Sequence, residues 1–195
     1  MVLEPSRRIL FDLVAVLSEA MDLVSPLVVD HHRWTSWFAA QIAEKMGLPS
    51  LELSRVVMAS LLHDVGAFSL KERLDTLNFE FENPQHHARL GYRLLHDFGP
   101  LREEAVIIRG HHSWWKPVKE DETGGEQVPP GSHIIHLADR IAILAGGDES
   151  GKVGVEDVLE MIGVRKGTVF MPAAVEAFRS RQPLGGSGRF PLHRA

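Results

Sequence analysis

The dipeptide His63-Asp64 lies at the end of an apolar run, and further histidines are spaced along the chain on both sides of it. An imidazole next to a carboxylate can serve two metal ions at once, because the histidine binds one ion while the aspartate bridges to the second. Eleven histidines are present, and six of them form three adjacent pairs: His31-His32, His86-His87 and His111-His112. The chain therefore carries the residue types of a metal centre, provided that its secondary structure brings them together.

The composition limits the classes of protein to which this chain can belong. A length of 195 residues suits a single domain with its own core. Cysteine is absent, which excludes disulfides and thiolate zinc sites and fits a reducing cytoplasm. The net charge of -5 argues against a nucleic-acid polymer or an anionic membrane as the partner. No uninterrupted apolar run reaches the roughly 18 residues of a membrane span, so we expect a cytoplasmic protein that does not enter a membrane.

Apolar residues recur at three- and four-residue spacings over almost the whole chain, which predicts an all-α fold. Capping residues mark several expected helix starts, such as Ser69 with Glu72 and Asn83 before Pro84. The predicted helices span about 6–24, 28–46, 51–64, 69–77, 84–98, 101–111, 133–145, 155–162 and 172–181. Residues 113–132 form a long predicted loop. We expect one domain over residues 1–182, with its core in 28–145, and a disordered tail over 183–195.

The first predicted helix is amphipathic. Its recurring apolar residues are Ile9, Leu10, Leu13, Leu17, Ala20 and Val24. This face could be part of the core, a linker or the seam of a homodimer, and the sequence leaves the three alternatives open.

Asp139 lies in the middle of the apolar stretch HIIHLADRIAIL, which should be buried. An ionised carboxylate in such a helix needs a cation or a strong hydrogen-bonding partner. A metal ion would supply that partner. Asp139 therefore joins the histidines as a candidate ligand.

Five segments in order carry a family resemblance: HHRWTSWFAAQIAEKMGLP, ASLLHDVGAF, HHARLG, IIRGHHSWW and VPPGSHIIHLAD. Together they resemble the HD superfamily of metal-dependent phosphohydrolases, and specifically its HD-GYP branch. The resemblance implies an HD-domain-like helical bundle with a dinuclear metal site.

The same resemblance implies a ligand set for two divalent ions. One ion would be held by His31, His63, Asp64 and Asp139. The other would be held by Asp64, His87, His111 and His112, so that Asp64 bridges the pair. The first histidine of the set is His31 by its spacing from Gly47, with His32 as the alternative. His32 and His86 are otherwise expected to be structural or to support the ligands, and the remaining histidines to be surface or packing residues: His96, His133, His136 and His193.

The implied activity is hydrolysis of a small phosphomonoester or phosphodiester, which includes nucleotides and cyclic dinucleotides. Two ions roughly 3.5–4 Å apart can share a hydroxide that attacks phosphorus in line. Imidazole and carboxylate ligands favour iron or manganese, with zinc, nickel or magnesium as alternatives.

The chain departs from the family pattern at three places. Ala67 stands where the family usually has a lysine that contacts phosphate, and a lost charge-assisted contact costs roughly 1.5–3 kcal/mol. The Gly-Tyr-Pro motif is missing after His111-His112. Leu27 stands where three-metal members have a glutamate, so we expect two ions.

Other residues could supply the substrate contacts. Lys71, Lys116 and Arg140 are candidates to replace the lysine, and Trp114 is a candidate to form a pocket wall or to stack on a base. The alternative to an enzyme is a regulatory module that binds metal, and a nucleotide, without turnover.

Overall fold

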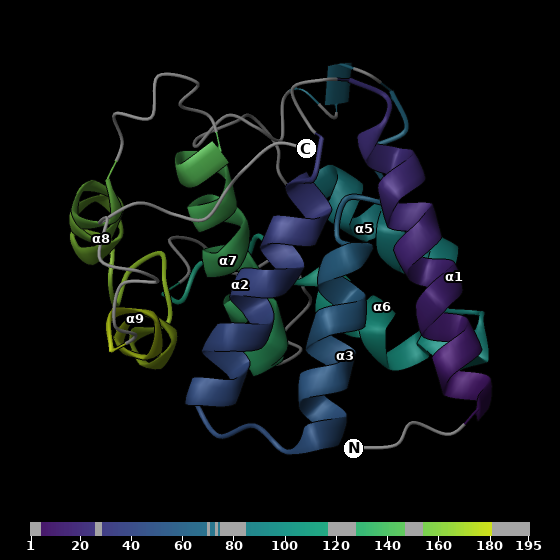
Figure 1. Cartoon of the computed structure of the whole chain (residues 1–195), viewed down its shortest axis with the longest axis horizontal. Coiled ribbons are helices and arrows are strands. Elements are labelled where there is room, and N and C mark those ends of the chain that lie inside the picture. Colours follow the sequence, from purple (N-terminus) through teal and green to yellow (C-terminus); the bar gives the residue numbers. More distant parts are fainter. Residues whose placement is uncertain are drawn as a thin grey trace.

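The computed structural model describes residues 5–25, 29–69, 71, 72, 74, 85–116, 128–146 and 154–180. These residues are almost entirely helical, as predicted, and their only β-type pairing is an isolated bridge between Lys166 and Phe170. The elements, labelled as in Figure 1, are α1 (Pro5–Asp22), α2 (His31–Lys45), α3 (Ser50–Leu61), α5 (Gln85–Leu95), η1 (Gly99–Leu101), α6 (Arg102–Arg109), α7 (Pro130–Gly146), α8 (Val155–Gly163) and α9 (Pro172–Arg179). None of these helices is both long enough and apolar enough to cross a bilayer.

Helix α2 is the centre of the bundle. It packs most extensively against α7 and α3, and it also contacts α9 and α1. Its buried side includes Ala39 and Ala43, whose small side chains let neighbouring helices approach closely, beside Phe38 and Ile42. Helix α7 is buried along most of its length. Helices α5 and α6 pack together, α1 lies at one side of the molecule, and α8 with α9 lies at the other (Figure 1).

The helix ends differ from the predicted ones where they matter for the site. Helix α3 ends at Leu61, so His63 and Asp64 lie in the turn that follows it rather than in the helix. Helix α2 begins at His31, after Asp30 in a left-handed conformation with φ of 63°. Helix α7 begins at Pro130, three residues before the predicted start. The predicted loop over residues 113–132 includes Pro130, but proline is well tolerated in the first turn of a helix.

Other predicted ends are confirmed or lie outside the described residues. Ser69 and Glu72 form the predicted capping box, because each side chain accepts from the backbone N–H of the other. The predicted cap at Asn83 and Pro84, most of the long loop and the tail are outside the described residues.

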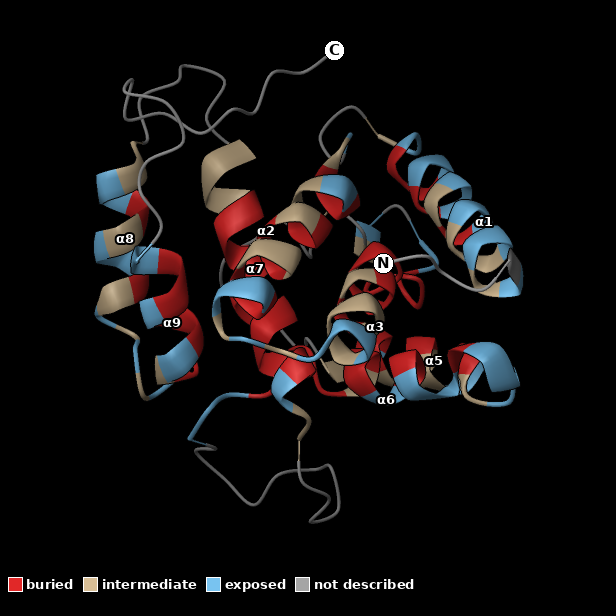
Figure 2. Ribbon diagram, turned by 60° about the horizontal axis from the view of Figure 1, so that its bottom comes forward, coloured by how far each residue is buried: buried red, intermediate tan, exposed pale blue. Residues whose placement is uncertain are grey.

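Helix α1 does not bury the apolar face that its spacing suggested. Val14, Ser18 and Met21 face the domain, whereas Ile9, Leu13, Leu17 and Val24 are largely exposed. Figure 2 shows this exposed strip along the outer side of α1. A period of about 3.6 identifies amphipathic faces, but it does not say which of two faces the domain covers.

Gly66 brings the His63-Asp64 turn into direct contact with α5. A Cβ atom at Gly66 would lie less than 3.0 Å from both the His87 carbonyl oxygen and the Gly91 backbone nitrogen. Only a residue without a side chain permits this approach. The glycine after the dipeptide therefore places Asp64 beside His87.

Candidate metal centre

The seven predicted ligands come together in one buried cluster. His31 lies at the start of α2 and His63 and Asp64 follow α3, while the others come from α5, the turn after α6, and the middle of α7. All seven are less than 9% exposed: His31, His63, Asp64, His87, His111, His112 and Asp139. Ionisable side chains are rarely buried in such number without a shared ligand.

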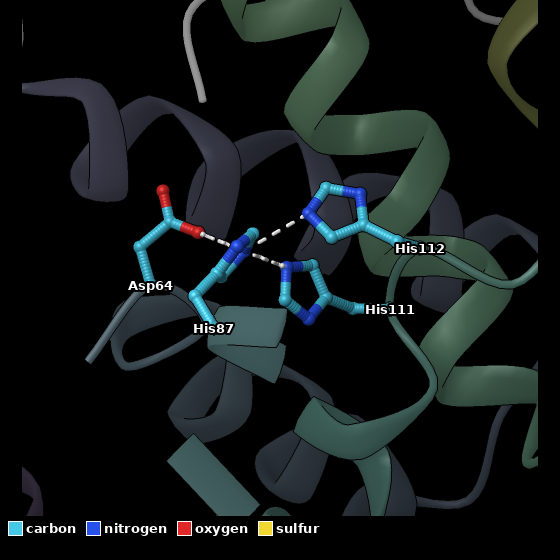
Figure 3. Close-up of side chains that lie close together, drawn as sticks. All are labelled: Asp64, His87, His111 and His112. Atoms are coloured by element: carbon cyan, nitrogen blue, oxygen red, sulfur yellow. Dashed lines mark hydrogen bonds and ion pairs between the residues drawn. The ribbon is translucent and has the colours of Figure 1, made fainter. Parts of the chain in front are cut away.

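One half of the cluster surrounds the Oδ1 atom of Asp64. This oxygen lies 3.0 Å from His87 Nε2 and 3.7 Å from His111 Nε2. His87 Nε2 lies in turn 3.3 Å from His111 Nε2 and 3.0 Å from His112 Nε2. Figure 3 shows the imidazoles of His111 and His112 and the carboxylate of Asp64 directed towards the His87 ring. Four potential ligand atoms thus converge within one small volume.

The other half surrounds the second oxygen of the same carboxylate. Asp64 Oδ2 lies 3.4 Å from His63 Nε2 and 3.9 Å from His31 Nε2. Asp139 Oδ1 closes this half, 3.3 Å from His31 Nε2 and 3.7 Å from His63 Nε2. The two histidine nitrogens are 3.3 Å apart. Asp64 therefore faces one group of ligands with each of its oxygens.

Two helix ends orient the imidazoles by the same device. His63 comes two residues after the end of α3, and its Nδ1 lies 2.8 Å from the Ser60 carbonyl oxygen in the last turn. His111 comes two residues after the end of α6, and its Nδ1 lies 2.7 Å from the Ile108 carbonyl oxygen. A carbonyl oxygen can only accept, so each Nδ1 carries a proton and each Nε2 points into the cluster. Metal-binding histidines are commonly oriented in this way.

The cluster also separates the protonation states of its histidines. Burial lowers the pKa of His111 to about 4, and it lowers the pKa of His112 well below its ordinary value with His111 and His87 adding to the shift. Burial acts in the same direction on His63, but Asp64 and Asp139 outweigh it and raise the pKa of His63 to about 9. Burial would raise the pKa of Asp64, yet the nearby histidines hold it well below its ordinary value. The Asp64 carboxylate is thus ionised, His111 and His112 are neutral at pH 7, and His63 is charged.

These residues fit divalent metal ions. Asp64 Oδ1 and Asp139 Oδ1 are buried without a hydrogen bond of acceptable geometry among the described residues, which is costly for anionic oxygens. A cation between the two groups of ligands removes this cost, and imidazole with carboxylate suits Fe, Mn, Zn or Ni.

The structure separates His31 from His32. His31 Nε2 lies in the cluster, whereas His32 Nδ1 makes a very short contact with Asp22 Oδ1 and the His32 backbone N–H donates to Asp22 Oδ2. The centroid of the His32 ring lies 4.9 Å from that of the His63 ring, so His32, held by Asp22, packs against a candidate ligand. Sequence spacing alone does not single out Asp22, because its partner His32 belongs to the next helix.

Among the substrate-binding candidates, only Arg140 lies in the cluster. Arg140 is 3% exposed, and its Nε and Nη2 donate to Asp139 Oδ2 at 3.1 and 2.6 Å. Lys71, Lys116 and Trp114 are exposed. Ala67 is completely buried, so no cationic side chain occupies the position of the family lysine.

The remaining histidines lie as expected where they are described. His86, beside His87, is exposed. His136 is buried with its Nδ1 3.2 Å from the Ser113 carbonyl oxygen, and burial together with Arg140 lowers its pKa to about 3. His133 packs against the edge of Trp115. His193 is outside the described residues.

Comparison with known proteins agrees with this site. In an alignment of 184 positions that covers 86% of its length, the chain is 26% identical to a protein named cyclic di-GMP phosphodiesterase from Thermotoga maritima. In an alignment of 161 positions that covers 79% of its length, it is 28% identical to 3'3'-cGAMP-specific phosphodiesterase 1 from Vibrio cholerae. It spans 47% of the first relative and 37% of the second. The chain is thus similar to less than half of each of these proteins.

A family match covers the part of the chain that holds the cluster. Residues 28–144 match the HD domain family, and all seven clustered side chains lie within this range. The match extends over more than half of the chain, and the all-α fold agrees with it. The protein belongs to the HD domain family.

Proposed function

We propose that this protein is a metal-dependent phosphohydrolase of the phosphodiesterase type that holds two divalent ions, iron or manganese by preference. The observation that carries the proposal is the division of the Asp64 carboxylate, with one oxygen facing His87 and His111 and the other facing His31 and His63. A carboxylate in this position is suited to bridge two ions. The likeness to phosphodiesterases supports the reaction class.

The charges of the proposed ligands favour an anionic substrate. When bound, two divalent ions would lower the pKa of water and neutralise phosphate charge. Five neutral imidazoles add no charge, and Asp64 with Asp139 contributes two negative charges. The loaded site would keep a net positive charge and attract a phosphate ester.

Arg140 acts in this proposal as a positioning residue. Its guanidinium donates two hydrogen bonds to Asp139 Oδ2. The other oxygen, Oδ1, is directed to His31 and His63. Such a fixed partner orients a carboxylate ligand and is worth roughly 10- to 100-fold in metal affinity. Because Arg140 is buried, the exposed Lys71 and Lys116 remain the candidates to contact phosphate.

We propose cyclic dinucleotides as the first substrates to test. Both relatives described above carry cyclic dinucleotides in their names. Trp114 follows His112 by two residues and is 47% exposed, so its ring could stack on a base beside the phosphate site. Because the Gly-Tyr-Pro motif is missing, the test should include cyclic dinucleotides with different bases.

The test is turnover of bis-p-nitrophenyl phosphate, cyclic di-GMP and 3'3'-cGAMP by Mn- or Fe-loaded protein. We expect hydrolysis by the wild type and a loss of at least ~100-fold in His87→Ala. His86→Ala is the matched control, because His86 is the exposed neighbour of His87, and it should stay within about twofold of the wild type. A metal-loaded protein without turnover on all three substrates would contradict the proposal.

A second function is favoured by one observation. Ala67 is fully buried where the family lysine would contact phosphate, which suits a regulatory module that binds metal and a nucleotide without turnover. Tight binding of a cyclic dinucleotide to a metal-loaded, inactive protein would favour this alternative. Turnover that depends on His87 would reject it.

A further inference from the structure

Helix α1 carries apolar residues on two opposite faces. One face packs on the domain through Phe11, Val14 and Met21, and Arg7 on the same face pairs with Glu104 of α6 at 3.5 Å. The opposite face exposes Ile9, Leu13, Val16 and Ala20, and the exposed Leu23 directly after the helix continues this row, which we call the α1 seam. Leu13 and Val16 at its middle are 63% and 65% exposed. Exposed apolar residues in a continuous row indicate an interaction surface more often than isolated ones do.

The spacing of the α1 seam is that of a coiled coil. Its members follow one another at steps of four, three, four and three residues. This repeat averages 3.5 residues, which keeps the row facing a single partner helix. The face that packs on the domain has the same steps, at positions 7, 11, 14, 18 and 21. The helix thus has a second packing face that its own domain does not use.

The charges beside the seam distinguish the two ways in which a copy of α1 could pair with it. In the seven-residue repeat of a coiled coil, written abcdefg, the a and d positions form the seam and the e and g positions flank it. With Leu13 and Ala20 at a, the g positions are Asp12 and Glu19, and the e positions include Leu17 and Val24. In an antiparallel pair, g positions face each other, so Asp12 would approach Glu19 of the partner subunit and the like charges would repel. In a parallel pair, g faces e, and Asp12 lies beside Leu17 of the partner subunit. Self-association is therefore compatible with the charges only in the parallel orientation.

We propose that the α1 seam binds the same seam of a second copy of this chain, to form a parallel two-fold symmetric dimer. A two-fold axis along α1 places the two domains on opposite outer sides, because each domain packs on the face opposite to its seam. The seam is confined to a helix of 18 residues, about 27 Å long, so association depends on protein concentration.

Sedimentation velocity of the full chain over a wide range of concentration tests the dimer. We expect a monomer–dimer equilibrium that Leu13→Glu weakens at least ~10-fold and that Ala20→Leu strengthens, since a larger a residue buries more apolar surface. Val164→Glu is the matched control, because Val164 is 73% exposed at the end of α8, on the other side of the molecule (Figure 1). Circular dichroism verifies that each variant is folded.

A cysteine test determines the orientation. The chain contains no cysteine, so Leu13→Cys introduces a single thiol at the seam. In a parallel dimer the two thiols face each other, and mild oxidation should join the chains much faster than in Val164→Cys. A wild type that stays monomeric at every concentration would overturn the proposal, as would a dimer that Leu13→Glu leaves unchanged. Cross-linking of Leu13→Cys no faster than Val164→Cys would overturn the parallel arrangement.

Discussion

At the residue scale, the proposed centre depends on how protons and lone pairs are distributed over a few buried side chains. Asp64 presents one oxygen to each half of the cluster, and His63 and His111 direct Nε2 inwards because their Nδ1 atoms lie against carbonyl oxygens. His63 differs from His111, because its pKa is raised to about 9 while burial lowers the pKa of His111 to about 4.

This difference predicts a proton linked to metal binding. In the metal-free protein, His63 is charged at neutral pH, so a metal ion must displace its proton, whereas His111 is already neutral. We expect affinity for Mn²⁺ to rise with pH until the pKa of His63, near 9, is passed. The pairing of charged His63 with Asp64 and Asp139 stabilises the metal-free fold. Because the pKa of His63 is higher in the folded state than in the unfolded one, this stabilisation is complete below about pH 6.5 and is lost as the pH rises to about 9.

Calorimetric titration with Mn²⁺ in buffers of different ionisation enthalpy measures the released protons. About one proton from His63 is expected at pH near 7.5. Binding without proton release, at an affinity independent of pH, would contradict the assignment of His63 as a charged group that becomes a ligand.

The candidate ligands could be predicted from the family resemblance, but their neighbours could not. All seven predicted side chains come together, because each lies near a helix end or on a buried helix that the apolar pattern identifies. The spacing favoured His31 over His32 without excluding His32, although one residue along a helix turns the side chain by about 100°. What holds His32 outside the cluster is Asp22, which belongs to the preceding helix.

At the element scale, two helix ends and one glycine hold the cluster. Helices α3 and α6 both stop two residues before a histidine, and the turn after α3 packs against α5 through Gly66. The site therefore depends on a close approach of backbones as much as on its ligands.

Substitution of Gly66 tests this dependence. Gly66→Ala must separate the turn from α5, and we expect a loss of roughly 2–4 kcal/mol in the free energy of unfolding together with weaker metal binding. Gly99→Ala is the control, because nothing lies within 4 Å of a Cβ atom at Gly99. Its unfolding midpoint in urea should stay close to that of the wild type. A Gly66→Ala protein as stable as Gly99→Ala would refute the close approach.

Helix positions could be predicted well, whereas their faces and exact ends could not. The period of the apolar residues identified the helices, but α1 has two apolar faces and only the folded domain decides which one it covers. Proline at the start of α7 and the early end of α3 reflect local capping that a periodic pattern does not contain.

At the scale of the whole molecule, the proposed ions connect elements that are far apart in the sequence. The ligands come from α2, α5 and α7 and from the turns after α3 and α6, so a loaded centre would link most of the bundle. Since the chain spans less than half of each of the two relatives, the activity of the whole protein is part of the proposal.

The metal stoichiometry of anaerobically purified protein, measured by mass spectrometry, tests the central claim most directly. We predict about two ions per chain in the wild type and in His86→Ala, about one in His112→Ala, and fewer still in Asp64→Ala, because only Asp64 faces both groups of ligands. Substoichiometric metal in the wild type, with no uptake of added Mn²⁺ or Fe²⁺, would contradict the dinuclear centre.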